Sequence, residues 1–392
     1  MKSVTIFLGA WTAVGILWWI VAAVVIARAN RMRSASAPKP SGKAQRISIF
    51  KPIPSPLGDR EFGAIRACLE TFIADLDTDS ELLLGARERE GERLRSFIEE
   101  IRERYPDARI ELLVDSIGAT PMHPKVAWNE KLSKLATGDW WLWSDADMRA
   151  PIGTLRSLRA DFAEGVGIVT SPYVVAGAPE PADMLDTLFV NMEFYPGAEL
   201  LGRSGALRGG FGAGMLFAAE DFHRSVDWRE LGSYLAEDFV LGTKLPPVRL
   251  ASTRMSTVPS SSTWGGALLH YLRWQKTIRW CQPGGFAAQL LVLPVIGWLA
   301  WLASGPGNTA AWAGLGTLLL ADTTAALAIN RLIGCRVGLR QLMIVPCWSV
   351  LRGLTWLACW LPWPVTWRGK RWWTARLYDP SQETSPPAEA TK

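Results

Sequence analysis

A long apolar segment near the N-terminus constrains this chain most. Residues 4–27 contain no charged side chain, and about 20 consecutive apolar residues are enough for a helix to cross a bilayer. A cleaved signal peptide is the competing interpretation, supported by the small residues at 35–37. The apolar run is too long for a signal peptide, only Lys2 precedes it as a basic residue, and a basic cluster follows it at once. We therefore predict an uncleaved transmembrane anchor at residues 1–28 and a basic linker rich in proline and serine at residues 29–45.

A second apolar region begins near residue 286, and the mean hydropathy of the whole chain is positive. Residues 286–303 and 309–329 are each long enough to span a membrane, and a Gly-Pro-Gly-Asn turn separates them. This pattern predicts a transmembrane hairpin at residues 284–330.

The last apolar stretch, residues 342–362, is also long enough to span a membrane but contains Arg352 and leads into a strongly basic segment. Because lysine and arginine concentrate on the cytoplasmic side of membranes, a simple span would place that segment on the wrong side. We predict an interfacial or re-entrant segment with a basic end at residues 331–376 and a disordered tail at residues 377–392. A fourth full span is the alternative.

The formal charge of +5 does not indicate a nucleic-acid partner, because basic residues gather beside the apolar segments. That placement favours retention in the cytoplasm and contact with anionic lipid head groups. The five cysteines show neither paired nor metal-ligand spacing, which indicates a reducing compartment without a disulfide or zinc framework. We therefore predict a multi-pass protein of the cell (inner) membrane whose globular part faces the cytoplasm. Its oligomeric state cannot be inferred from the sequence.

Between the two apolar regions, short apolar runs alternate with amphipathic stretches. This alternation predicts an α/β fold, a mainly parallel sheet with helices on both faces, for a domain at residues 46–264. An interfacial amphipathic helix is predicted at residues 265–283. The predicted strands are residues 46–51, 81–86, 109–114, 140–144 and 166–171. The predicted helices are residues 60–74, 91–104 and 124–136.

Two aspartates follow the most apolar of the predicted strands. Residues 140–143 form a continuous apolar run, as in strands buried on both faces, and Asp145 and Asp147 come directly after it. Open parallel sheets bind ligands beyond the carboxyl ends of their strands. Two aspartates separated by one residue can share a hard divalent cation that takes diphosphate oxygens as its other ligands. A solvated turn is the alternative, since aspartate also favours turns; the position after a buried strand favours a binding site.

Two later segments each have a functional and a structural interpretation. Asp238 lies in an acidic pair among apolar residues, which fits either the polar face of an amphipathic helix or a general base in a cleft. Arg273 and Trp274 fit an interfacial helix, in which tryptophan lies at the level of the lipid head groups. In the functional interpretation, Arg273 binds a diphosphate and Trp274 forms a wall of the acceptor site. The residues alone do not decide between these interpretations.

Taken in order, these segments resemble the ceramide glucosyltransferase group of the processive-type inverting glycosyltransferases, which includes bacterial hopanoid-glycosylating relatives. The similarity covers roughly residues 46–376. The segments that carry it are residues 47–52 (ISIFKP), 123–126 (HPKV), 144–147 (SDAD), 171–174 (SPYV), 214–215 (GM), 236–238 (AED), 270–274 (HYLRW) and 367–371 (WRGKR).

The resemblance implies a GT-A nucleotide-sugar-binding fold, a UDP-sugar donor, a Mg²⁺ or Mn²⁺ ion, inversion by single displacement, and a lipid hydroxyl as acceptor. It also implies roles for the residues that match the motifs. Asp145 and Asp147 would face the metal and the nucleotide, Asp238 would be the base, Lys125 would lie near the nucleotide, and Arg273 with Trp274 would complete the site.

Three departures from the pattern of the family stand out, one of them Ala127-Trp128 in place of the small polar pair that is common after Lys-Val. No aspartate follows the predicted strand at residues 81–86, so Glu88 must take the role beside the uracil if any residue does. His270 stands where glutamine or arginine is usual, and a second Arg-Trp pair at residues 279–280 leaves the register of the motif open. The choice of donor is therefore less constrained than the type of reaction.

Three functions are consistent with these features. The first is transfer of glucose or another hexose from a UDP-sugar to the hydroxyl of ceramide, with N-acetylglucosaminyl transfer to a hopanoid-like lipid as a variant. The second is synthesis and export of a polysaccharide, although about three spanning helices are few for a channel. The third is a membrane adaptor that retains the fold without catalysis, which the altered positions Glu88 and His270 keep open.

Overall fold

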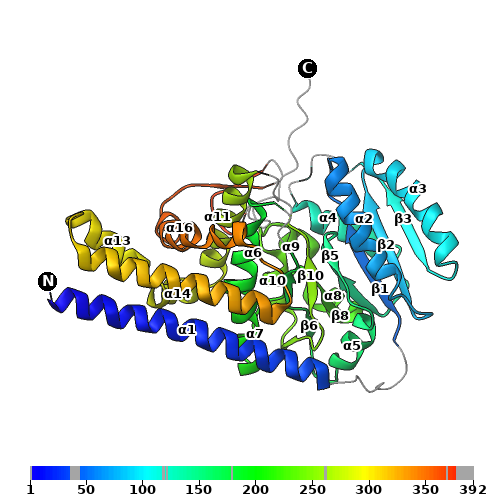
Figure 1. Ribbon diagram of the computed structural model, residues 1–392. Coiled ribbons are helices and arrows are strands. Elements are labelled where there is room, and N and C mark those ends of the chain that lie inside the picture. The colour runs from blue at the N-terminus through cyan, green and yellow to red at the C-terminus, as the bar shows by residue number, and fades with distance from the viewer. Residues whose placement is uncertain are drawn as a thin grey trace, which may run out of the picture.

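A computed structural model of the chain describes residues 2–35, 45–116, 120, 122–177, 180–259, 263–367 and 370–376. Most of the predicted linker and the predicted tail at residues 377–392 lie outside this range. The described chain has two parts, a sheet-containing domain and a set of helices of which the longest project away from it (Figure 1).

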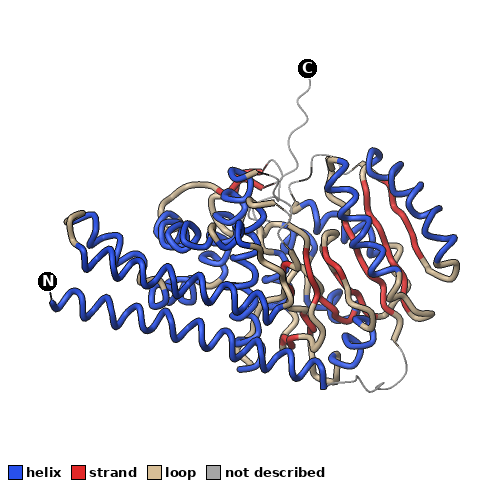
Figure 2. Tube along the Cα trace, in the orientation of Figure 1, coloured by secondary structure: helices blue, strands red, loops and turns tan. Residues whose placement is uncertain are grey.

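The central sheet has seven strands in the order β3-β2-β1-β4-β8-β6-β9 (Figure 2). Within it only β8 pairs antiparallel with its neighbours, and the other pairings are parallel. All five predicted strands are present, with ends within two residues of the prediction. The strands are β1 (Ile47–Pro52), β2 (Ser80–Ala86), β3 (Ile110–Val114), β4 (Trp140–Trp143), β6 (Ile168–Thr170), β8 (Met215–Ala218) and β9 (Val248–Leu250).

Two small sheets complete the strand content of the described residues. One joins β5 (Met148–Arg149), β10 (Met255–Thr257) and β7 (Tyr173–Val175). The other is a hairpin of β11 (Val365–Trp367) and β12 (Lys370–Trp372). The first sheet lies next to the aspartates that follow β4, since β5 begins directly after Asp147.

Helices cover both faces of the central sheet. Side chains alternate between the two faces along each strand, so neighbouring residues of one strand belong to different apolar cores. In β1, Ile49 joins the apolar core under α2 and α3, whereas its neighbour Phe50 packs with Trp141 and Trp143 on the opposite face. The predicted α/β fold with a mainly parallel sheet is therefore confirmed. Helices of the first face are α2 (Asp59–Ile73), α3 (Glu88–Arg104) and α5 (Thr154–Asp161); those of the second are α4 (Pro124–Ser133), α8 (Ala219–Ser225), α9 (Trp228–Gly232) and α10 (Glu237–Lys244).

Two helices among the described residues are long and apolar enough to cross a membrane, α1 (Lys2–Ala35) and α14 (Thr309–Ile333). They run side by side (Figure 1) and are joined by polar contacts in the middle and near the C-terminal end of α14. Trp19 donates from Nε1 to Asp322 at 2.7 Å, and Asn30 donates to the Leu332 carbonyl at 2.7 Å. Because polar groups inside an apolar layer are costly to leave unpaired, these bonds fix the register of the two helices.

The single helix predicted at residues 286–303 is wrong, because this segment is broken. It consists of α12 (Pro283–Ala288), a short 3₁₀ turn (Gln289–Val292) and α13 (Val295–Ser304), with a bend of 62°. Pro294 causes the break, since proline donates no backbone hydrogen bond and disfavours a helical residue before it. By length and composition, the described residues hold two candidate spans, or three if the bent pair counts as one.

The remaining helices pack around the base of the candidate spans. Arg352 of α16 is 7% exposed, lies 3.6 Å from Glu193, and has its guanidinium over the ring of Trp19. This packing gives the arginine a place inside the protein instead of in solvent. The helices are α6 (Asp183–Leu188), the π-helix η1 (Phe189–Phe194), α7 (Tyr195–Ser204), α11 (Trp264–Cys281), α15 (Leu339–Leu342) and α16 (Val345–Ala358).

A buried carboxylate connects α1 to the sheet-containing domain. Glu199 of α7 is fully buried and forms ion pairs with Arg33 at the end of α1 and with Arg203, the latter at 3.0 Å. Arg33 also donates to the Tyr195 hydroxyl at 2.9 Å and to the Ser252 carbonyl at 3.0 Å. The end of α1 is therefore held by the domain through several charge-assisted bonds.

An Arg33→Met variant should lower the free energy of unfolding by about 2 kcal/mol, because it removes charge-assisted hydrogen bonds and leaves Glu199 with one cationic partner. Thermal unfolding of the detergent-solubilised protein measures the effect. Arg31→Met is the matched control, since Arg31 is exposed on the same helix. Equal midpoints for the two variants would contradict a stabilising role of the Arg33 contacts.

Candidate active site

The predicted aspartates lie at the carboxyl end of β4, where a lysine joins two acidic segments. Lys125, in the first turn of α4, has its Nζ 2.6 Å from Asp145 Oδ1 and 2.9 Å from Glu237 Oε1. Burial alone would lower the pKa of Lys125, but the charges of Asp145 and Glu237 together outweigh it and raise that pKa above its ordinary value. The lysine is therefore cationic at neutral pH and holds the two acidic segments together.

Gly212 connects Asp145 to the predicted base. Its carbonyl accepts from the Asp145 backbone N–H at 2.9 Å, and its own N–H donates to Asp238 Oδ2 at 2.9 Å. A Cβ atom at this position would lie 2.6 Å from Asp145 Oδ2. Only glycine lets the backbone approach the carboxylates this closely, so Asp145 and Asp238 share one rigid support. We call Lys125, Asp145, Asp147, Glu237 and Asp238 the carboxylate cluster.

Asp147 is half-buried and has few polar partners. Thr257 donates to its Oδ2 at 3.3 Å. Burial, and then the negative charge of Asp145, raise the pKa of Asp147 to about 6. A divalent cation would relieve this repulsion, so the two carboxylates fit a bound Mg²⁺ or Mn²⁺. The described residues contain no group of three or more histidine, cysteine, aspartate or glutamate side chains placed to hold a metal, so further ligands would have to come from water or substrate oxygens.

Asp238 lies in the first turn of α10 and is held at both oxygens. Besides the bond from Gly212, its Oδ1 accepts from the Phe239 backbone N–H at 2.8 Å. Burial raises the pKa of Asp238 to about 7, and the negative charge of Glu237 adds to the rise. A carboxylate with a pKa near the pH of the cell can exchange a proton with a substrate, as a general base must. Asp238 thus lies on a helix, α10, and its role as a general base stays a prediction.

Lys51 is a site residue that the sequence analysis did not identify. Its Nζ donates to the Asp145 carbonyl at 2.7 Å and to Ser144 Oγ at 2.9 Å, and it lies 3.6 Å from the centre of the Phe72 ring. Burial lowers the pKa of Lys51 to about 7. The signal was present in the sequence: a lysine closes the apolar strand β1, and β1 ends beside β4.

Two further residues of the site were quoted in the sequence motifs without a role. Glu237 binds Lys125, and Tyr173 of β7 lies within electrostatic reach of the cluster. Burial, followed by the charges of Asp238, Asp145 and Asp147, raises the pKa of Tyr173. Its phenol stays protonated at neutral pH and is available as a hydrogen-bond donor.

Arg273 and Trp274 lie on α11, next to the cluster. The Trp274 ring stacks on Phe189, with 4.7 Å between the ring centres, and its centre lies 3.9 Å from that of the His270 ring. His270 Nδ1 lies 3.1 Å from Asp186 Oδ1. The charge of Arg273 acts on Tyr173 and on His123, both of which are near the carboxylates. The structure thus places Arg273 within electrostatic reach of the site and Trp274 in an aromatic stack beside it.

Glu88 differs from the other predicted site residues. It follows β2 at the correct edge of the sheet, but it is exposed and forms an ion pair with Arg95, 3.7 Å away on the same helix. Among the described residues, no contact joins Glu88 to the carboxylate cluster. Its place beside the nucleotide therefore stays a prediction.

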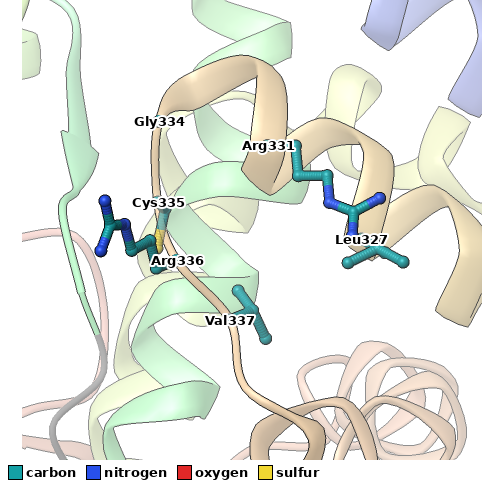
Figure 3. A pocket seen from close by; sticks show the side chains of 6 residues that line it. All are labelled: Leu327, Arg331, Gly334, Cys335, Arg336 and Val337. Atoms are coloured by element: carbon teal, nitrogen blue, oxygen red, sulfur yellow. The ribbon is translucent and has the colours of Figure 1, made fainter.

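One cavity in the described part of the chain lies away from the cluster. It has a volume of about 320 Å³ and is lined by Leu327, Arg331 and the turn after α14 (Figure 3). None of the predicted site residues lines it. The candidate site is therefore defined by the convergence of charged side chains at the end of β4 and not by this cavity.

Comparison with known proteins gives two findings. A crystal structure titled GalNAc-T7 with UDP, GalNAc and Mn²⁺ is similar, with 12% sequence identity and a TM-score of 0.40. The match covers 62% of this chain and 51% of that chain, so this chain matches about half the length of the solved structure. A search of curated proteins finds no match. The model of the family described as Glycosyl transferase family 21 matches residues 11–376, almost the whole described chain, and confirms the resemblance to ceramide glucosyltransferases. The chain belongs to Glycosyl transferase family 21.

Proposed function

We propose that this glycosyltransferase moves a hexose from a UDP-sugar to the hydroxyl of a membrane lipid, with inversion at the anomeric carbon. The observation that carries the proposal is the pairing of Asp145 and Asp238 across Gly212, with one carboxylate suited to a metal and the other to a proton. Separate groups for the leaving diphosphate and for the attacking hydroxyl are what a single displacement requires.

In the proposed reaction, an acceptor oxygen attacks the anomeric carbon while the bond from that carbon to the diphosphate oxygen breaks. Asp238 takes the proton of the attacking hydroxyl. Asp145 and Asp147 hold the cation, which when bound neutralises charge on the leaving diphosphate. Lys125 and Arg273 add positive charge on the same side of the site, where the diphosphate would lie.

Helix α11 supports a lipid acceptor, because it lies near the cluster and also packs against the helices around the candidate spans. At its C-terminal end lies Cys281: burial raises the pKa of its thiol to about 12, and the charge of Asp238 acts in the same direction. Along its length α11 packs against α6, α12 and α16. A hydroxyl at the surface of the bilayer could thus reach Asp238 with its apolar tail in the membrane. We place the site at the cytoplasmic face of the cell (inner) membrane.

The test supplies membranes containing the protein with UDP-glucose or UDP-N-acetylglucosamine and analyses their lipids by mass spectrometry. We expect a new lipid carrying one hexose, absent with Asp238→Asn, and its mass distinguishes ceramide from a hopanoid-like acceptor. A water-soluble polymer would instead assign the chain as a polysaccharide synthase. Unchanged lipids with every UDP-sugar and acceptor class would reject the proposal.

The pH dependence of the reaction should report the pKa of Asp238. Since a base must be unprotonated, kcat/KM should increase with pH up to about 7 and then level off. In a Glu237→Gln variant the rise should move to lower pH, because the negative charge of Glu237 raises the pKa of Asp238. Initial rates between pH 5 and 9, an interval of about two units on either side of that pKa, provide the measurement. An unshifted profile would show that another group controls the rate.

A further inference from the structure

We propose that the C-terminal hairpin β11–β12 and His123 beneath it are positioning elements for the reaction, holding Lys125 and Glu237 in place. The inference deepens the proposed function and rests on it for the roles of these two residues. Its structural basis is a set of contacts that the hairpin makes with both segments leading into the carboxylate cluster.

The first segment is the turn before α4. Lys370 of β12 donates from Nζ to the Thr120 carbonyl at 2.6 Å and to the Met122 carbonyl at 2.7 Å. Two residues after Met122 the chain enters α4, which carries Lys125 in its first turn. One ammonium group thus fixes the backbone from which the lysine of the cluster emerges.

His123 lies between the hairpin and the cluster. The Trp367 ring of β11 stacks on its imidazole at 4.4 Å with an angle of 17° between the planes, and its backbone N–H donates to the Gly232 carbonyl at 2.6 Å. Its Nε2 lies 3.4 Å from Glu237 Oε2. Burial, and then the charge of Lys125, keep the pKa of His123 well below its ordinary value. A neutral imidazole can orient Glu237 without competing with Lys125 for its charge.

The second segment leads directly to Glu237 and Asp238. The Leu235 backbone N–H donates to the Ala375 carbonyl at 3.0 Å, and the Leu235 side chain packs with Val365 and Trp372. Beyond the hairpin, the Arg376 guanidinium lies 4.6 Å from the centre of the Tyr234 ring. The residues just before the proposed base are therefore held by the same short structure as the turn before Lys125.

The chain that leads into the hairpin is also hydrogen-bonded to the helices around the candidate spans. The chain between α16 and β11 is held by α11, where Lys276 donates to the Leu361 carbonyl at 2.6 Å and Arg279 to the Cys359 carbonyl at 3.0 Å. The hairpin thus connects the helices around the candidate spans with both segments that lead into the carboxylate cluster. In the proposal, these contacts hold the carboxylate cluster in a fixed position relative to the membrane helices, from which the acceptor lipid approaches.

The test compares Lys370→Met with Lys370→Arg and with the control Lys134→Met, which alters an exposed lysine at the end of α4. We expect Lys370→Met to raise amide hydrogen exchange about tenfold in residues 122–125 and 232–238, because charged hydrogen bonds to both carbonyls of the turn are lost. The exchange of β1 should be unchanged, which shows that the domain is still folded. Lys370→Arg should restore most of the protection.

In the transfer assay, Lys370→Met should lower kcat about tenfold with the acceptor KM unchanged, since alignment and not acceptor binding is affected. His123→Phe keeps a ring against Trp367 and removes the contact with Glu237, and it should lower kcat with normal exchange. Unchanged exchange of Lys370→Met in both segments would overturn the inference. Because exchange needs no turnover, it decides the positioning role even if no UDP-sugar proves to be a substrate.

Discussion

Replacing Asp238 with asparagine should slow sugar transfer by about 10²- to 10⁴-fold, the usual contribution of a positioned acid or base. The amide has the same shape and can still accept from one of the two backbone N–H groups that bind Asp238, those of Gly212 and Phe239, so the fold of the backbone should be retained. It has no charge and cannot take a proton from the acceptor. The effect should appear in kcat, because the lost interaction develops as the hydroxyl is deprotonated.

Initial rates with saturating donor and acceptor measure this loss, and donor binding measured by calorimetry should be unaffected. Asp107→Asn is the matched control, since Asp107 is an exposed aspartate in a loop of the same domain. A rate for Asp238→Asn within a factor of about two of the unaltered protein would assign the base to another residue.

An Asp145→Asn variant should bind the UDP-sugar more weakly by about 10- to 100-fold, and only in the presence of a divalent cation. One charged interaction contributes about 1.5–3 kcal/mol, and about 1.4 kcal/mol corresponds to a tenfold change. The substitution removes negative charge facing the proposed metal and leaves Lys125 paired with Glu237 alone. Donor binding should therefore depend less on the metal than in the unaltered chain.

Calorimetric titration with UDP-sugar in the presence of Mg²⁺, of Mn²⁺ or of a chelator separates the contributions. In the unaltered chain the chelator should weaken binding, and in Asp145→Asn it should have little further effect. Metal-dependent binding of normal strength in the variant would move the proposed metal away from β4. Asp221→Asn, on the outer helix α8, provides a charge-matched comparison.

Local sequence patterns predicted individual strands and helices of this fold. The continuous apolar run Trp140-Trp141-Leu142-Trp143 became a central strand, because a strand with neighbours on both edges and helices on both faces tolerates no polar side chain. The position of Asp145 and Asp147 at its carboxyl end followed from that assignment. Length and hydropathy likewise identified both candidate spans.

Features that arise from contacts between residues far apart in the sequence could not be predicted from these patterns. The burial that raises the pKa of Asp238 comes from tertiary packing, and its bond from Gly212 joins residues far apart in the sequence. Its helix could therefore be predicted, but its raised pKa could not. Lys51 resembled an ordinary strand end until β1 was paired with β4. The prediction of one helix at residues 286–303 rested on apolar length alone and did not consider Pro294.

The contacts of α1 have a practical consequence for producing this enzyme in soluble form. Trp19, Ala22 and Ile26 of α1 are buried against α6, α14 and α16, and Arg33 pairs with Glu199 inside the domain. Deleting α1 would uncover an apolar trough and deprive a buried acid of one cation. A truncated enzyme should therefore still require detergent, and surface substitutions along that trough are a better route to solubility than removal of the helix.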